Sequence, residues 1–180
     1  MQATRVKPTG AQRTFSLDEI LVTKTNSDDV IVYANDAFID VSGYTEAEII
    51  GATHEIVRHP DMPRGLSKHL TAMLKDGQEM FVYIPQLTKD GTTYWVLAHV
   101  TPSRDSAGRV VGEHSHDRAP DPASIAEASA IYSRLMAEER RHPDPEAAKA
   151  ASIRMFTEFL DDKGMTYEEW VWSITKEWSA

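Results

Sequence analysis

The sequence of 180 residues contains no cysteine. This absence excludes disulfide bonds, cysteine-ligated zinc, iron–sulfur clusters and thiol nucleophiles. No apolar run approaches the roughly 20 residues that a membrane-spanning helix requires, and residues 1–13 lack the apolar stretch of a signal peptide. We therefore expect a cytoplasmic protein without a membrane anchor, whose residues 1–14 form a flexible leader.

Basic residues are also scarce, because 19 lysines and arginines stand against 28 aspartates and glutamates, which leaves a formal net charge of −9. An acidic surface repels a phosphate backbone, so nucleic acid is not an expected partner. The 41% of hydrophobic and 26% of charged residues are typical of a folded protein. The length suffices for one well-buried domain and an accessory element.

The usual motifs of catalysis are missing too. The sequence has no glycine-rich phosphate loop, no His-Glu-x-x-His helix motif and no nucleophile elbow. We therefore expect that the protein is not an enzyme and that it acts by binding a ligand or a partner.

The residues that are present divide into two zones. Residues 15–118 alternate short β-like runs with short helical ones, whereas residues 119–180 are rich in alanine, glutamate and arginine and have almost no β signal. Pro120 and Pro122 mark the boundary, because proline interrupts both helices and sheets. The sequence therefore predicts a domain over 15–118, followed by a helical extension over 119–180.

The first zone predicts an α+β fold. Apolar runs bounded by turn residues, such as Asp90-Gly91, indicate the strands. These are Ile20–Lys24, Val30–Tyr33, Phe81–Leu87, Thr93–Thr101 and Arg109–His116. Between the second and third strands, short helices are expected over Asn35–Val41, from the capping box Thr45–Glu48, and over Pro63–Leu74. This order favours an antiparallel sheet of five strands with short helices on one face.

The second zone predicts helices over Ser124–Arg141, with Ser124 as the cap, and over Ala147–Leu160 and Tyr167–Trp178. Large aromatic side chains recur along them: Tyr132, Phe156, Phe159, Tyr167, Trp170, Trp172 and Trp178. At helical spacing, aromatic residues most often belong to a core. The alternative is a face that binds a partner, because aromatic anchors dominate interface energetics.

Several motifs resemble the PAS domain family. Asn35-Asp-Ala-Phe38 followed by Val41-Ser-Gly-Tyr-Thr45 is similar to the first helix of PAS domains, and the predicted order of strands and helices is the PAS order. Ile56-Val-Arg-His-Pro-Asp-Met-Pro63 is more specific and resembles the FAD-binding PAS domains of bacterial aerotaxis receptors. Lys89-Asp-Gly91 and Tyr94-Trp-Val96 fit the same group. The resemblance implies a PAS sensory domain with a pocket between the helices and the sheet.

The resemblance also implies a set of cofactor-binding residues. These are Asn35, Arg58, His59, Asp61, Gln86, Trp95, Val96, Ala98 and His114. By comparison with flavin-binding light-oxygen-voltage PAS domains, Gln86, Val96, Ala98 and His114 fall at the positions that line the flavin. The amide of Gln86 can satisfy a donor–acceptor edge of a flavin ring. Arg58, His59 and Asp61 either hold polar parts of a ligand or form a local ion pair and cap that holds their loop.

Cofactor identity has several alternatives. FAD is the first, although Gln86 and Met80 stand where aerotaxis-type domains usually carry Asn and Trp. A covalent thiol–flavin adduct is excluded because the thiol is missing, so redox state is the expected signal. Haem, with His69 as axial ligand, is the second alternative, and an unoccupied pocket is the third. His99, His114 and His116 offer a less favoured metal site, with the last two on one face of a strand.

These features together predict a stand-alone bacterial PAS sensory protein that signals by protein–protein contact. Because no effector domain follows in this sequence, we expect output through the helical extension. The expected partner is a signalling protein such as a histidine kinase or chemoreceptor component, or a second copy of the chain. The alternatives are a cofactor-free interaction or dimerisation module and a haem-based gas or redox sensor.

Overall fold

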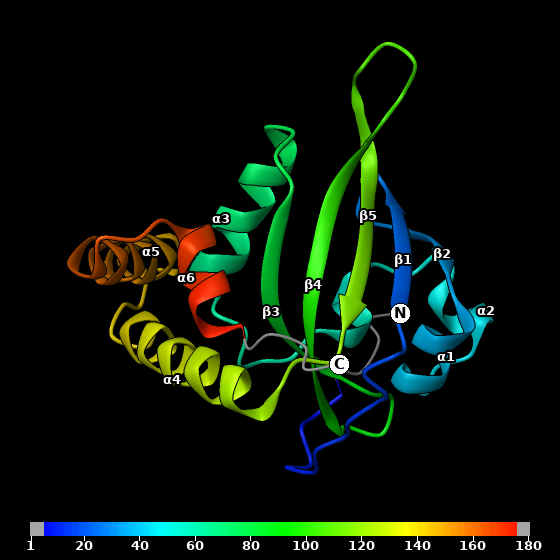
Figure 1. Ribbon diagram of the computed structural model, residues 1–180, viewed down its shortest axis with the longest axis horizontal. Coiled ribbons are helices and arrows are strands. Elements are labelled where there is room, and N and C mark those ends of the chain that lie inside the picture. The colour runs from blue at the N-terminus through cyan, green and yellow to red at the C-terminus, as the bar shows by residue number, and fades with distance from the viewer. Residues whose placement is uncertain (1–5, 176–180) are drawn as a thin grey trace.

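The computed structural model describes residues 6–175, and its centre is a five-stranded antiparallel sheet in the order β2-β1-β5-β4-β3 (Figure 1). The strands are β1 (Leu21–Asn26), β2 (Ile31–Ala34), β3 (Met80–Leu87), β4 (Thr93–Arg104) and β5 (Val110–Arg118). Their order along the chain and the antiparallel pairing confirm the predicted α+β PAS fold.

The connection between β2 and β3 supplies the helices on the inner face of the sheet. These are α1 (Asp36–Ser42), α2 (Glu46–Ile49), the 3₁₀ turn η1 (His54–Val57) and α3 (Arg64–Lys75). Thr45 and Glu48 form the predicted capping box at the start of α2. Helix α3 packs Leu66, Leu70 and Leu74 toward the sheet, because residues three and four apart share one face of a helix.

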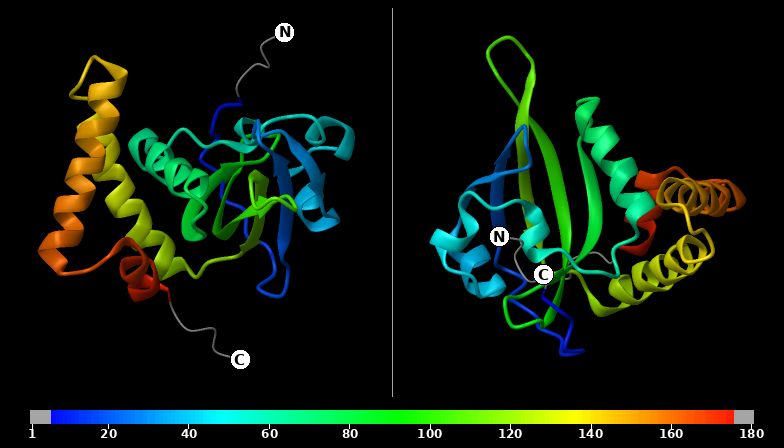
Figure 2. Two further views of the ribbon diagram at one scale, coloured as in Figure 1. Left: turned by 90° about the horizontal axis from the view of Figure 1, so that it is seen from above. Right: turned by 180° about the vertical axis from the view of Figure 1, so that it is seen from behind.

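The extension consists of α4 (Pro122–Glu139), α5 (Pro145–Lys163) and α6 (Tyr167–Ile174). Helices α4 and α5 form a hairpin, and α3 lies between this hairpin and the sheet (Figure 2). The N-cap of α4 is Asp121 and not the predicted Ser124, since Pro122 occupies the first turn and Asp121 accepts hydrogen bonds from Ala123 N and Ser124 N.

Helices α3 and α5 approach each other most closely at Gly65. A Cβ atom added to this glycine would lie 2.1 Å from Ser152 Oγ and 2.6 Å from the backbone oxygen of Lys149. The carboxylate of Glu139, at the end of α4, accepts hydrogen bonds from Gly65 N at 2.8 Å and from Ser152 Oγ at 2.9 Å. Glu139 thereby connects the end of α4 to the start of α3 and to the middle of α5.

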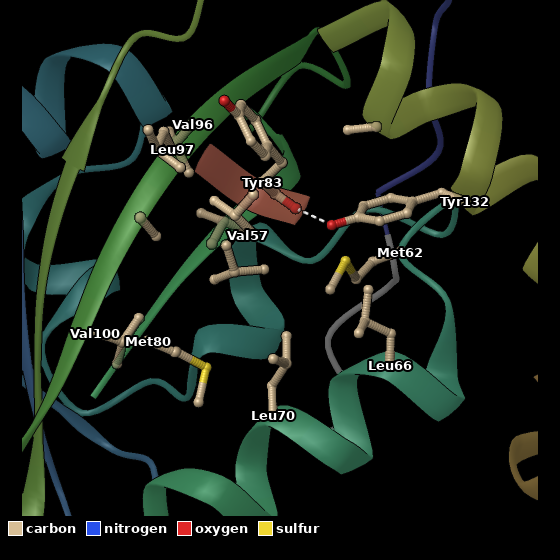
Figure 3. Packing of buried hydrophobic residues seen from close by; sticks show 14 of the residues in the cluster. Val57, Met62, Leu66, Leu70, Met80, Tyr83, Val96, Leu97, Val100 and Tyr132 are labelled. Atoms are coloured by element: carbon tan, nitrogen blue, oxygen red, sulfur yellow. Dashed lines mark hydrogen bonds between the residues drawn. The ribbon is translucent and has the colours of Figure 1, made fainter. Parts of the chain in front are cut away.

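The extension also covers the edge of the sheet formed by β3. Tyr132 of α4 donates a hydrogen bond from its hydroxyl to the carbonyl of Tyr83 at 2.6 Å, drawn as a dashed line in Figure 3. Tyr167 of α6 donates in the same way to the carbonyl of Phe81 at 3.0 Å. An edge strand presents unpaired backbone groups, and these two hydroxyl groups satisfy two of them.

The aromatic side chains of the extension lie mainly in a core, as the favoured interpretation expected. Tyr132, Phe156 and Trp170 are each at most 3% exposed, whereas Trp172 is 45% exposed and contacts Phe81. Trp178 lies outside the described residues.

Part of the predicted flexible leader is attached to the sheet. Thr9 N donates to Gly91 O, and Arg13 N donates to Thr93 O, while Thr93 N donates back to Ala11 O. Arg13 also donates from its guanidinium to the carbonyl of Val41. Residues 9–13 therefore pair with the start of β4.

Tyr132→Phe tests the connection between the extension and the β3 edge. Removal of the buried hydroxyl leaves the Tyr83 carbonyl without this donor, so unfolding free energy should fall by about 1–2 kcal/mol in urea denaturation. The control is Tyr33→Phe, whose side chain is exposed and whose change should stay within about 0.5 kcal/mol. Equal effects of the two substitutions would contradict the assignment.

Candidate functional site

A cavity of about 720 Å³ lies between α3, η1 and the inner face of the sheet, within the range of roughly 300–1,000 Å³ typical of small-molecule sites. Its apolar lining comes from the helices and from β3 and β4. The residues are Val57, Met62, Leu70, Leu74, Met80, Val82, Ile84 and Val100. Figure 3 shows Leu70 directed toward Met80 and Val100 across this space.

The rest of the lining is polar, and β5 contributes Glu113, Ser115 and Asp117 to it beside residues of the β1–β2 turn, η1 and α3. Asp117 is 3% exposed, and its Oδ1 accepts a hydrogen bond from Ser115 Oγ at 2.5 Å. Burial raises the pKa of Asp117 to about 6, although the Ser115 hydrogen bond acts in the opposite direction. The pKa of Glu113 is also raised, first by burial and then by the nearby Asp29. The cavity therefore has a wall whose charge depends on pH.

One polar atom of the cavity lining, Oε1 of Gln86, is buried without a hydrogen-bond partner among residues 6–175. Oγ1 of Thr25 and the hydroxyl of Tyr94 are also buried without a partner, but neither residue lines the cavity. A buried acceptor without a donor costs about 1–3 kcal/mol. The Gln86 amide is thus suited to receive a hydrogen bond from a ligand.

The loop before α3 carries Arg58, His59 and Asp61, which the sequence analysis treated as one group. The structure gives these residues different surroundings. Arg58 lines the cavity, pairs with Glu55, and forms a backbone bridge with Gln86. His59 is buried away from the cavity lining, where Nε2 lies 3.0 Å from Thr93 Oγ1 and Nδ1 accepts from Asp61 N. Burial lowers the pKa of His59, against the opposing effect of Asp61.

The geometry therefore favours the ligand-binding interpretation for one residue of this loop and the structural interpretation for the other two. Arg58 is placed to contact a ligand. His59 and the exposed Asp61 instead hold the loop against the start of β4.

Asn35 has a structural role in the described contacts. Its Oδ1 accepts hydrogen bonds from Val22 N and Phe38 N, and its Nδ2 donates to Ile20 O. One amide thus caps α1 and ties it to β1. Asn35 does not line the cavity.

The strands divide the remaining predicted residues between two faces. Val96 and Ala98 are fully buried on the inner face of β4, opposite Ile84 and Val82, but neither lines the cavity. Trp95 points to the other face, where its ring contacts Tyr132 of α4. Trp95 therefore does not line the cavity, and the structure does not support its predicted contact with the cofactor.

His114 also lies on the outer face, contrary to the expectation from the resemblance to flavin-binding PAS domains. Ser115 and Asp117 line the cavity, so the residues between and before them face away. The His114 and His116 rings lie 4.1 Å apart, which confirms that they share a face. Burial and the neighbouring His116 lower the pKa of His114.

The alternatives involving haem and metal receive no support from the geometry. His69 is exposed on α3 and does not line the cavity. Among residues 6–175, no group of three or more histidines and carboxylates is arranged to hold a metal ion. Over the same range, no helix combines the length and the apolar character that crossing a membrane requires.

The sequence interpretation missed Asp117, Ser115 and Glu113 as lining residues, and also His54. Strand β5 carries Glu113-His-Ser-His-Asp117, which lacks the alternation of apolar and polar residues that would mark its inner face. A shift of one residue exchanges the two faces of a strand. The pairing of Asp117 with Ala98 settles the register, but this pairing is not visible in the sequence.

Comparison with known proteins agrees with this architecture. Residues 31–113 match the family described as PAS fold. The chain is 34% identical over 120 residues to the aerotaxis receptor of Escherichia coli strain K12, a match that covers 67% of this chain and 24% of the receptor. It is also 29% identical over 83 residues to phototropin-2 of Oryza sativa subsp. japonica, covering 46% of this chain and 9% of that protein.

Among solved structures, the light-state LOV domain of the blue-light photoreceptor Aureochrome1 is similar. The TM-score is 0.55 at 26% identity, and the match covers 60% of this chain and 87% of that one. The fold and these matches show that the chain belongs to the PAS family, and its domain is of the PAS/LOV sensory type. The chain spans only a small part of the curated relatives named above.

Asp117→Asn tests the pH-dependent wall. The folded-state pKa of Asp117, about 6, exceeds the ordinary value of 3.8, so its contribution to stability is complete below the ordinary value and is lost as pH rises through the folded value. Between about pH 4 and about pH 6.5, the wild type should lose about 1–3 kcal/mol of unfolding free energy relative to Asp117→Asn. Urea denaturation at a series of pH values measures this difference.

The control for this prediction is Asp18→Asn at an exposed position, which should keep the wild-type pH profile. If Asp117→Asn follows the same profile as the wild type, the carboxyl group of Asp117 does not titrate as described.

Proposed function

We propose that this chain is a sensory protein of a bacterial, cytoplasmic signalling pathway, and that a flavin, FAD first, binds in the cavity between α3 and the sheet. The observation that carries the proposal is the Gln86 amide, whose buried Oε1 lines the cavity and has no donor among residues 6–175. The resemblance of Ile56–Pro63 to FAD-binding aerotaxis domains supports the same ligand.

The residues around the cavity fit a flavin in three respects. The apolar side chains of α3, β3 and β4 can enclose a flat aromatic ring system. Gln86 offers an acceptor and a donor on one amide. Arg58 adds a cation beside Gln86, which suits the anionic part of a flavin nucleotide.

When bound, a flavin supplies a redox-active ring whose hydrogen-bonding edge changes with its oxidation state. The chain's own contribution is to hold that edge against Gln86 and to exclude water with Met80, Val82 and Val100. Asp117 can retain or release a proton at its carboxyl group near pH 6. A change at the ring would thus reach β3 through Gln86 and β5 through Asp117.

Gln86→Leu tests the assignment of the cavity. The substitution removes both hydrogen-bonding atoms and leaves a shorter, apolar side chain, so added FAD should bind at least about tenfold more weakly. Flavin absorption and fluorescence titration of the purified protein measure this loss.

The matched control is Gln78→Leu, at an exposed position outside the cavity, and it should bind FAD like the wild type. A wild-type protein that takes up no flavin would contradict the proposed ligand. That outcome would favour the cofactor-free interaction module.

We also propose that output passes through α3 to the extension. One side of α3 lines the cavity with Leu70, and the opposite side meets α5 at Gly65. A ligand can shift an equilibrium only through unequal affinity for two states, and α3, like β3, contacts both the ligand space and the extension. The proposed partner is a signalling protein such as a histidine kinase or chemoreceptor component, or a second copy of this chain.

Hydrogen exchange tests this route in the intact protein. Saturating FAD should slow amide exchange in α3 and in α5, because ordering α3 also orders the helix packed on it. Helix α1, which packs on β1, serves as the internal reference. Protection confined to β3 and β5 would contradict transmission through α3.

A further inference from the structure

One end of the cavity is acidic, and the proposed function assigns no part of a ligand to it. Asp28 and Asp29 of the β1–β2 turn line this acidic end together with Glu113 of β5. The lysine nearest to them in the lining is Lys75 of α3, which is exposed and forms no ion pair among residues 6–175. Such an excess of negative charge favours a bound cation.

The acidic end lies far from Gln86 along the cavity. Met80 and Gln86 are six residues apart on β3, which corresponds to roughly 20 Å in an extended strand. Met80 pairs with Val100 of β4, and β4 continues from there to Pro102, which pairs with Glu113. Glu113 therefore lies beyond Met80, so a ring held at Gln86 and a group held at Glu113 can occupy different parts of the cavity.

Glu113 is a half-buried carboxylate without a partner. Among residues 6–175 it accepts no hydrogen bond and forms no ion pair. Burial and then the nearby Asp29 raise the pKa of Glu113, although His54 and Lys75 act in the opposite direction. A bound cation would compensate both the lost hydration of Glu113 and its repulsion by Asp29.

Thr25 of β1 provides an independent sign of an unfilled contact at this end. Its Oγ1 has no hydrogen-bond partner among residues 6–175, and the residue is only 5% exposed. Thr25 pairs directly with Glu113, so both side chains stand on the same face of the sheet. Thr23 on this face of β1 lies with Oγ1 3.1 Å from Nε2 of the cavity-lining His54. An unpartnered hydroxyl group therefore lies next to the unpartnered carboxylate, although Thr25 itself does not line the cavity.

The arrangement suits an organic cation and not a metal ion. Among residues 6–175, no group of three or more histidines and carboxylates is placed to hold a metal. Leu74, Met80 and Val110 supply apolar surface beside the carboxylates, which can hold the carbon skeleton of an amine. A protonated primary amine also has three donors, which suit the free acceptors of Glu113 and Thr25.

We propose that the acidic end of the cavity binds the ammonium group of a primary amine, whose apolar part lies against Leu74, Met80 and Val110. Glu113 is the main anion of the site, and Asp28 and Asp29 add to its negative potential. The inference goes beyond the proposed function, because it gives the cavity a second class of ligand and does not require a bound flavin.

Calorimetric titration with phenethylamine, in a buffer free of amines, tests this site in the whole chain. Glu113→Gln keeps the size of the side chain and removes its charge, so phenethylamine should bind about tenfold more weakly. The reference ligand is 2-phenylethanol, which has a similar shape and no charge. It should not distinguish the variant from the wild type.

The matched control is Glu127→Gln, which removes the same charge at an exposed position of α4 outside the cavity. This variant should bind phenethylamine like the wild type. Asp28→Asn, in the exposed turn, keeps the test decisive if Glu113→Gln does not fold, and it should weaken binding about two- to fivefold. Equal losses in Glu113→Gln and Glu127→Gln would overturn the site, and so would a wild type that binds no phenethylamine.

Separate titrations with FAD and with phenethylamine distinguish this inference from the proposed function. If the wild type binds phenethylamine and takes up no FAD, the proposed function fails and the amine site stands. If the wild type takes up FAD and binds no phenethylamine, the amine site is overturned and the proposed function stands.

Discussion

The close approach of α3 and α5 at Gly65 is the constraint on which the rest of the arrangement depends. The nearest backbone atom to a Cβ atom at this position would be the Lys149 carbonyl oxygen, and backbone cannot rotate away as a side chain can. The two helices are therefore packed so closely that no side chain fits between their backbones at this point. Because α3 is also a wall of the cavity, this contact is the direct connection through which we propose that the ligand space and the extension are coupled.

Glu139 reinforces this coupling. Its carboxylate binds an α3 amide and the Ser152 hydroxyl of α5 while its own backbone belongs to α4. Ser152 is fully buried and Glu139 is half-buried, so this contact is partly shielded from water. The extension is thus attached at two places, at the Glu139 junction with α3 and at the β3 edge.

Local chemistry made much of the fold predictable. Three features were predictable because each depends on only a few neighbouring residues: the turn around Asp90 and Gly91, the Thr45 capping box and the Asn35 motif. The structure contains all three. The face of β5 was not predictable, because both faces of Glu113–Asp117 are polar. The groove between α3 and α5, which Lys68 and Lys149 line, was not predictable either. These two residues lie 81 positions apart in the chain, and only helix packing brings them together.

The pairing of both sheet edges limits how copies of this chain can meet. At the β3 edge, two tyrosine hydroxyl groups donate hydrogen bonds to carbonyl groups of β3. At the β2 edge, Ile31 exchanges backbone hydrogen bonds with Gly51 and Ala52. A neighbouring chain therefore finds little free backbone on which to add a strand. Self-association would instead join side chains across faces, such as the outer surface that carries His114 and His116. Such contacts depend on side-chain charge and shape, so they can be reversible and can respond to pH.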